Sequence, residues 1–291
     1  MRFAFIQTHA RIWRVTTMCR VLEVSRAGYY AWRARPLCER VKDDRVLTAQ
    51  IREIQTQVKQ RYGSPRMHQE LRALGFTCGK HRVARLMREA GLPAKSASAF
   101  HPPTTQSTHG EPVAPNVVNR QFSLASNPAP GVTWAGDITY VPTREGWLYL
   151  AVLLDLATRR VVGWALRTSL HQELTLAALE MALLHSGARG GRHHSDRGVQ
   201  YAAHAYQRRL AAADFTASMS RVGDCWDNAV VESFFATLTK ELLGDRAFET
   251  RAEARRAVFE FIEIWYNRKR RHSTLGYLTP VEFEEHLLKA G

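Results

Sequence analysis

Residues 192–196 read Arg-His-His-Ser-Asp, and residues 227–238 read Asp-Asn-Ala-Val-Val-Glu-Ser-Phe-Phe-Ala-Thr-Leu. The first stretch predicts a short strand that ends at Asp196, because a polar Arg-Gly pair follows it. The second predicts a helix with Asp227 as its N-cap and Glu232 in its early turns. Apolar residues recur there at helical spacing: Val231, Phe234, Phe235 and Leu238. One acid is thus expected at a strand end and another on a helix.

A third acid, Asp137, interrupts the β-rich run Val-Thr-Trp-Ala-Gly-Asp-Ile-Thr-Tyr-Val at residues 132–141. An aspartate is out of character in such a run, because strands favour β-branched and aromatic residues. Acids from a strand interior, a strand end and a helix can converge on one site rich in oxygen atoms. Mg²⁺ prefers oxygen ligands of this kind. Two such ions would stabilise the attacking and leaving oxygens of a phosphoryl transfer.

Other residues near these acids have more ordinary explanations. Asp155 also interrupts a strand, but the Leu-Ala-Thr-Arg-Arg that follows it favours a role in a hairpin turn. His193 and His194 are candidate ligands, yet no cysteine is near them and an all-oxygen site suits Mg²⁺ better. Asp224 and Asp227 favour loop and helix-cap roles. Each of the three central acids, taken singly, is also compatible with a solvated surface position.

The charge of the chain is strongly basic and unevenly distributed. The 291 residues carry a formal net charge of +14 and the pI is near 10.1, which indicates a polyanionic partner such as nucleic acid. Residues 1–100 contain 20 Lys and Arg against 7 Asp and Glu, whereas residues 101–291 contain 21 against 20. We therefore expect DNA binding in the first part of the chain and chemistry in the second.

The cysteines and the hydropathy pattern exclude several other classes of protein. The four cysteines form no CxxC pair and have no histidines at zinc-finger spacing, so we expect reduced thiols rather than a zinc site or a disulfide framework. The longest apolar run, residues 148–154, is far too short to span a bilayer. The N-terminus has no apolar signal-peptide region. These features predict a cytoplasmic protein with no membrane contact.

Residues 1–93 predict an all-helical, basic region with a helix-turn-helix outline. Helices are expected near residues 43–58, 64–74 and 79–91, because apolar residues recur on one face and glycines end the last two. The last helix presents a basic face that we expect to lie on DNA, made of Lys80, Arg82, Arg85 and Arg88. A helical bundle with a solvated charged face would give the same local pattern.

Residues 94–131 predict a linker rich in Pro, Ser, Thr and Asn, and an α/β domain over residues 132–291. Three antiparallel strands followed by alternating helices and strands indicate a layered fold with a mixed sheet. Strands are expected at residues 132–142, 147–155, 159–167, up to 196, and 215–219. Helices are expected at residues 171–185, 200–213, around Glu232, and 250–267, before a basic tail.

The chain resembles the downstream-frame (OrfB-type) transposases of insertion sequences, members of the DDE, retroviral-integrase-like superfamily. Thirty-five residues lie between Asp196 and Glu232, the spacing for which this D,D(35)E family is named. The resemblance extends over nearly the whole length. Its signatures occur in the family's order at residues 24–30, 62–71, 134–140, 193–198, 224–229, 232–235, 265–277 and 279–283.

This resemblance implies an RNase H-like catalytic core in which Asp137, Asp196 and Glu232 are the catalytic acids. They would hold two Mg²⁺ ions, for which Mn²⁺ is a substitute. The implied activity is DNA cleavage at the ends of an insertion sequence, followed by direct strand transfer. The alternatives are a nuclease of the same fold without strand transfer and a relic that only binds DNA.

The resemblance also implies the partners. These are double-stranded DNA, further copies of the chain assembled on it, and an upstream-frame product that is fused or associated, all in a bacterial, nucleoid-associated setting. The family usually has Lys or Arg seven residues after the catalytic Glu, where it contacts DNA. Here that position is Thr239, and Lys240 follows it. We expect the remaining DNA contacts from Lys240, Arg270 and Arg271.

Overall fold

The structure, a computed structural model, describes residues 1–36, 38–95, 112–123, 125–221, 225–244 and 247–290. Part of the predicted linker and Asp224 lie outside this range. Within it, no helix is both long and apolar enough to cross a membrane. The N-terminal part of the chain is helical: α1 Arg2–His9, α2 Val15–Val21, α3 Arg26–Ala34, α4 Glu39–Gln57, α5 Ser64–Ala73 and α6 Lys80–Glu89.

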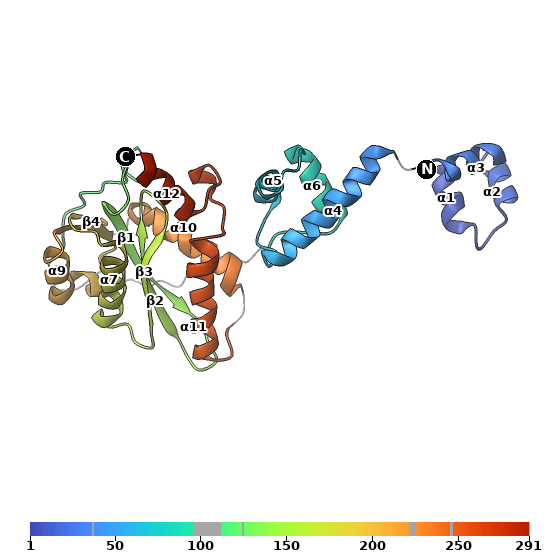
Figure 1. The fold of residues 1–291 in the computed structure, drawn as a ribbon. Coiled ribbons are helices and arrows are strands. Elements are labelled where there is room, and N and C mark those ends of the chain that lie inside the picture. The colour runs from blue at the N-terminus through green and yellow to red at the C-terminus, as the bar shows by residue number, and fades with distance from the viewer. Residues whose placement is uncertain (37, 96–111, 124, 222–224, 245–246, 291) are drawn as a thin grey trace.

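A five-stranded mixed sheet forms the centre of the C-terminal part, as the sequence predicts (Figure 1). The strand order is β3-β2-β1-β4-β5. The first three strands are antiparallel neighbours, and β4 and β5 continue the sheet in parallel from β1. The bounds are β1 Thr133–Val141, β2 Leu148–Asp155, β3 Val161–Arg167, β4 Gly191–Ser195 and β5 Phe215–Met219.

Helices cover both faces of this sheet. Trp134 and Ile138 of β1 pack with α7, α8 and α9, whereas Ala135 and Val141 pack in a second cluster with α10 and α11. Because side chains alternate across a strand, Asp137 projects toward the second face. The bounds of these helices are α7 Gln172–Ser186, α8 Val199–Ala202, α9 His204–Ala211, α10 Ala229–Leu238 and α11 Arg251–Phe259, and a last helix, α12 Pro280–Ala290, follows.

Several helices differ from the sequence expectation. The single helix expected over 200–213 is two, α8 and α9, and the helix α12 was not anticipated. Both α10 and α11 continue as π-helical segments, Thr239–Leu243 and Glu260–Tyr266. In each, the turn is closed by hydrogen bonds to the fifth residue back, such as Gly244 N–H to the Thr239 carbonyl at 2.8 Å. Hydrophobic periodicity alone does not reveal such widened turns.

The helices α4, α5 and α6 share a core and contact the C-terminal part of the chain. Leu47, Ile51 and Ile54 of α4 pack with Met67, Leu71, Val83 and Leu86. At the contact, Tyr62 donates its hydroxyl to the Lys269 carbonyl at 2.9 Å, and Arg66 donates to the Arg271 carbonyl at 2.8 Å. The Arg61 guanidinium lies over the Trp265 ring, 4.8 Å from its centroid.

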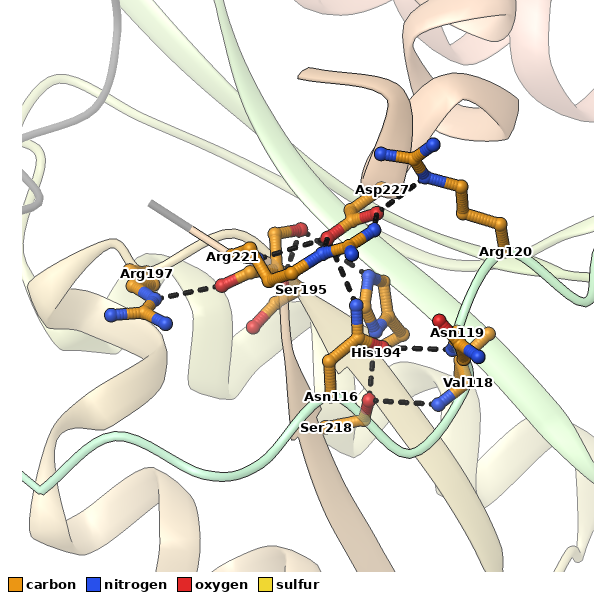
Figure 2. Close-up of polar contacts among 11 residues, drawn as sticks. Asn116, Val118, Asn119, Arg120, His194, Ser195, Arg197, Ser218, Arg221 and Asp227 are labelled. Atoms are coloured by element: carbon orange, nitrogen blue, oxygen red, sulfur yellow. Dashed lines mark hydrogen bonds and ion pairs between the residues drawn. The ribbon is translucent and has the colours of Figure 1, made fainter. Parts of the chain in front are cut away.

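The end of the predicted linker is fixed on the core. Val118 is 1% exposed, and the backbone N–H groups of Val117 and Val118 donate to the Ser218 hydroxyl on β5. Asn116 and Arg120 donate to the carboxylate of Asp227, just before α10 (Figure 2). The described residues 112–123 are therefore held against the C-terminal part of the chain.

Gly163 on β3 allows α7 to approach the sheet closely. A Cβ at this position would overlap the backbone oxygen of Ala178 and lie 2.8 Å from the Cβ of Ala182. We predict that Gly163→Ala lowers the free energy of unfolding by about 1–3 kcal/mol, because the helix must shift away from the sheet. Chemical denaturation measures this change. Gly79→Ala is the control, because its Cβ would meet nothing within 4 Å, and an equal loss there would contradict the argument.

Candidate active site

Asp137 and Asp196 meet at the point where two parallel strands separate. The last residue pair between β1 and β4 is Gly136 with Ser195. Asp137 and Asp196 directly follow these two residues. Neighbouring strands run about 5 Å apart, which brings the two carboxylates to the same edge. Asp137 and Asp196 are both half-buried. This is the convergence that the sequence predicts for a strand interior and a strand end.

Glu232 reaches this edge from α10. The start of that helix is tied to β1 because the side chain of Asn228, its N-cap, donates to the Gly136 carbonyl at 3.3 Å. Burial of the apolar residues of α10 fixes its rotation, and the Glu232 side chain is left exposed. These buried residues are Val231, Phe234, Phe235 and Leu238. The sequence anticipated this apolar face, but not the contact made by Asn228.

The three acids are within electrostatic reach of one another. Burial raises the pKa of Asp137 well above its ordinary value, and the negative charges of Asp196 and Glu232 raise it further. The Ile138 N–H, which donates to Asp137 at 2.7 Å, opposes this effect. In the described part of the chain, no three His, Cys, Asp or Glu side chains are already gathered closely enough to hold a metal ion.

The donor chemistry nevertheless fits divalent cations of the Mg²⁺ type. All three side chains offer hard oxygen ligands. Burial is the main cause of the raised pKa of Asp137, and the negative charges of Asp196 and Glu232, which add to it, are charges that a cation would offset. Histidine ligands are disfavoured. His193 is buried and bonded to the Tyr206 hydroxyl at 2.9 Å, and burial lowers its pKa to about 3. His194 is likewise buried, against Ser218.

Asp155 has a structural role, as its sequence context indicates. It is 1% exposed, and its Oδ1 accepts from the N–H of Ala157 and from the N–H and hydroxyl of Thr158. Its Oδ2 accepts from the Gly131 N–H at 2.7 Å. Both carboxylate oxygens are thus occupied by donors of the turn and of the preceding segment, and Asp155 is not a ligand candidate.

The expectation that Asp227 is the N-cap of α10 is wrong. Asn228 occupies that position, and Asp227 is fully buried one residue earlier. Its carboxylate accepts from Arg221 and Arg120 at 2.8–3.0 Å, and these charged donors outcompete the backbone N–H groups of the helix (Figure 2). The Arg221 guanidinium is the largest influence that lowers the pKa of Asp227.

The residues predicted to contact DNA differ in their surroundings. Lys240 is exposed and lines a cavity of about 500 Å³ beside Ser233, the neighbour of Glu232. The same cavity is lined by Arg61 and Arg66, so it is basic. Arg270 is only 6% exposed, and its Nε donates to Glu241 at 2.9 Å. This burial gives Arg270 a structural role, although Arg270 also lines the same cavity, and its contact with DNA stays a prediction.

The remaining basic residues are partly neutralised within the protein. Arg82 and Arg85 both pair with Asp44 on α4, and Arg85 also pairs with Glu89. Arg271 pairs with Glu70. Lys80 and Arg88 are exposed on α6. The pairing with Asp44 crosses from α6 to α4, so the sequence pattern of one helix could not reveal it.

Three family models match the chain. Two describe an integrase core domain, at residues 127–225 and 213–280, and the third describes an HTH-like domain at residues 42–99. Transposase InsF for insertion sequence IS3A of Escherichia coli (strain K12) is 41% identical over 287 residues, which are 98% of each chain. The chain belongs to the IS3 family of insertion-sequence transposases.

Further similarities accompany this relationship. The insertion element IS600 uncharacterized 31 kDa protein of Shigella sonnei is 42% identical to this transposase over 269 residues, 92% of this chain and 97% of that protein. Among solved structures, the HTLV-2 integrase catalytic core domain in complex with magnesium is 16% identical with a TM-score of 0.41. That match covers 54% of this transposase and 97% of that chain.

We predict that Asp137→Asn raises the Tm of the transposase near pH 8 when divalent ions are absent, because it removes the buried charge beside two others. The folded-state pKa of Asp137 is raised, so the folded protein binds this proton more tightly than the unfolded chain does. Wild-type stability therefore falls as pH rises above the unfolded value, and the advantage of the variant disappears as pH approaches about 4.

Thermal melts across pH check this prediction, with exposed Asp214→Asn as the control. Millimolar Mg²⁺ should then raise the Tm of the wild type more than that of Asp137→Asn, because a ligand that binds the folded state stabilises it. A variant less stable than the wild type at every pH would contradict the repulsion between these acids.

Proposed function

We propose that Asp137, Asp196 and Glu232 are the catalytic acids of this transposase and hold two divalent metal ions, Mg²⁺ or Mn²⁺. The observation that carries the proposal is their convergence at the edge where β1 and β4 separate beneath α10, with a raised pKa at Asp137. When bound, the ions would activate the attacking oxygen and offset the charge on the leaving oxygen. The carboxylates act as ligands and not as nucleophiles.

The transposase would cut DNA at an end of its element and release a 3′-hydroxyl. That hydroxyl would then attack a target phosphodiester directly, so one phosphodiester bond forms as another breaks. The chain supplies positioning and charge for both steps. Its partners would be double-stranded DNA, further copies of the transposase on that DNA, and an upstream-frame product, in the bacterial cytoplasm at the nucleoid. The 41% identity to an IS3 transposase over the full chain disfavours a binding-only relic.

We predict that Asp137→Asn, Asp196→Asn and Glu232→Gln each reduce both cleavage and joining by at least about 100-fold, because each removes one ligand charge from the proposed ions. Gel assays on a labelled duplex from the element end measure both products. DNA binding in the absence of metal should stay within about threefold of wild type, since these acids repel phosphate rather than attract it.

Asp155→Asn is the buried control for these variants. It should lower stability, because the amide nitrogen that replaces Oδ2 cannot accept from the Gly131 N–H, but the folded fraction should keep its activity. Joining near the wild-type level by any of the three acid variants would refute the assignment. Cleavage without joining in the wild type would favour the nuclease alternative.

Lys240 is the basic residue best placed to contact the DNA end. It is exposed on the cavity beside Ser233, whereas Thr239 is half-buried at the start of the π-helical segment. We predict that Lys240→Ala lowers joining about tenfold, because a charge-assisted contact contributes about 1.5–3 kcal/mol. Thr239→Lys should gain less than this. A gain of about tenfold from Thr239→Lys, with Lys240→Ala unaffected, would contradict the placement.

A further inference from the structure

The first three helices form a small unit with its own core (Figure 1). Ile6, Met18, Cys19 and Tyr29 are its buried residues, and Phe3, Val15, Leu22 and Val24 pack around them. Tyr29 also donates its hydroxyl to Gln7 at 2.8 Å, which joins α3 to α1. This unit precedes the HTH-like match and lies outside it, so the matches assign it no role.

The connection between α2 and α3 is a tight turn of the helix-turn-helix kind. The Val24 N–H donates to the Cys19 carbonyl at 3.0 Å and closes the end of α2, with Glu23 in the left-handed region at φ 52°. Ser25 then caps α3, because its hydroxyl accepts from the Gly28 N–H at 2.9 Å. The turn is therefore short and fixed at both ends, as in DNA-binding units of this type.

The outer face of α3 is basic and aromatic. Tyr29 points into the core, and Arg26, Tyr30 and Arg33 follow one another at spacings of four and three residues, so they share one side of the helix. All three are exposed. On the preceding helix, Thr16, Thr17 and Arg20 are exposed as well. A second helix with such a face is the element that enters the major groove in helix-turn-helix proteins.

The charges of this unit are available for a partner. Residues 1–36 contain a single acid, Glu23, against seven arginines: Arg2, Arg11, Arg14, Arg20, Arg26, Arg33 and Arg35. Within the described residues, none of these arginines takes part in an ion pair. The contrast with α6 is direct, because Arg82 and Arg85 there are paired with Asp44. The unit therefore carries uncompensated positive charge, whereas the face of α6 is partly neutralised.

We propose that α1–α3 is a second DNA-binding unit of the transposase, with α3 as its reading helix in the major groove of duplex DNA. Arg26 and Arg33 would contact the phosphates that flank the groove, Tyr30 would face the base edges, and Arg20 of α2 would contact the DNA backbone nearby. This proposal rests on the proposed function insofar as DNA is the substrate. It adds a recognition element that is separate from α4–α6 and from the catalytic acids, and it predicts two contacts along one DNA duplex.

The test uses the full-length transposase with EDTA, so it does not depend on catalysis. Binding of a fluorescein-labelled random-sequence duplex is measured by anisotropy at several salt concentrations. The variant Arg26→Gln/Arg33→Gln should bind about 10- to 100-fold more weakly, and its salt slope should fall by about 1.8, since each lost phosphate contact removes about 0.9. Tyr30→Ala should weaken binding without changing the slope.

The control is Arg167→Gln/Arg208→Gln, which removes the same charge from exposed positions of the catalytic part. It should leave affinity and slope near the wild-type values. All substituted side chains are exposed. A melting curve for each variant serves to check that it is folded. Equal losses of DNA affinity in the two double variants would mean that only the net charge of the protein matters, and this would overturn the proposal. An altered oligomeric state with an unchanged salt slope would also overturn it, because the face would then join copies of the chain.

Discussion

A carboxylate in the middle strand of a sheet is the constraint on which the catalytic part depends. Asp137 pairs with Val152 of β2 and directly follows Gly136, the last β1 residue paired with β4, so its backbone is held in place by the sheet. Its charge is disfavoured by burial and by two further acids. The surrounding elements hold it in place: β4 ends one residue before Asp196, and Asn228 fastens α10 to Gly136. Holding the charged Asp137 carboxylate in this position lowers the stability of the fold, and it also leaves negative charge where a cation can bind.

A second set of interactions connects this site to the helices that precede it. Glu241, which follows α10, accepts from Arg270 and Trp265, and its backbone carbonyl accepts from Arg61. Arg66 on α5 contacts the same region through the Arg271 carbonyl. The helix that carries Glu232 and the HTH-like helices therefore share one network of buried or half-buried groups. A movement of α5 on DNA binding would therefore be transmitted through these contacts to the segment that follows Glu232.

The sequence predicted the layers and the mixed sheet, because alternation in strands and spacing in helices are local signals. The meeting of Asp137 with Asp196 was expected from the resemblance to DDE transposases. It also separated Asp155 from the other acids through its turn context. It misassigned Asp227 and could not foresee the burial of Arg270. The burial of Arg270 depends on Glu241, which is distant in the sequence, and Asp227 is held by distant Arg120 as well as by nearby Arg221. The pairing of Arg82 with Asp44 was hidden for the same reason.

The two π-helical segments touch, since Trp265 in the second donates to Glu241 in the first at 2.8 Å. Each widened turn accommodates more residues than an α-helical turn does. Up to Leu238, the number of residues from Glu232 and the α-helical period together give the face on which a side chain lies. From Thr239 on, the helix is wider, so the same number of residues corresponds to a different direction around the axis. The seven-residue count from Glu232 that assumes an α-helix therefore ends inside the first widened turn, and the directions of Thr239 and Lys240 are set by the π-helical segment and not by α-helical periodicity.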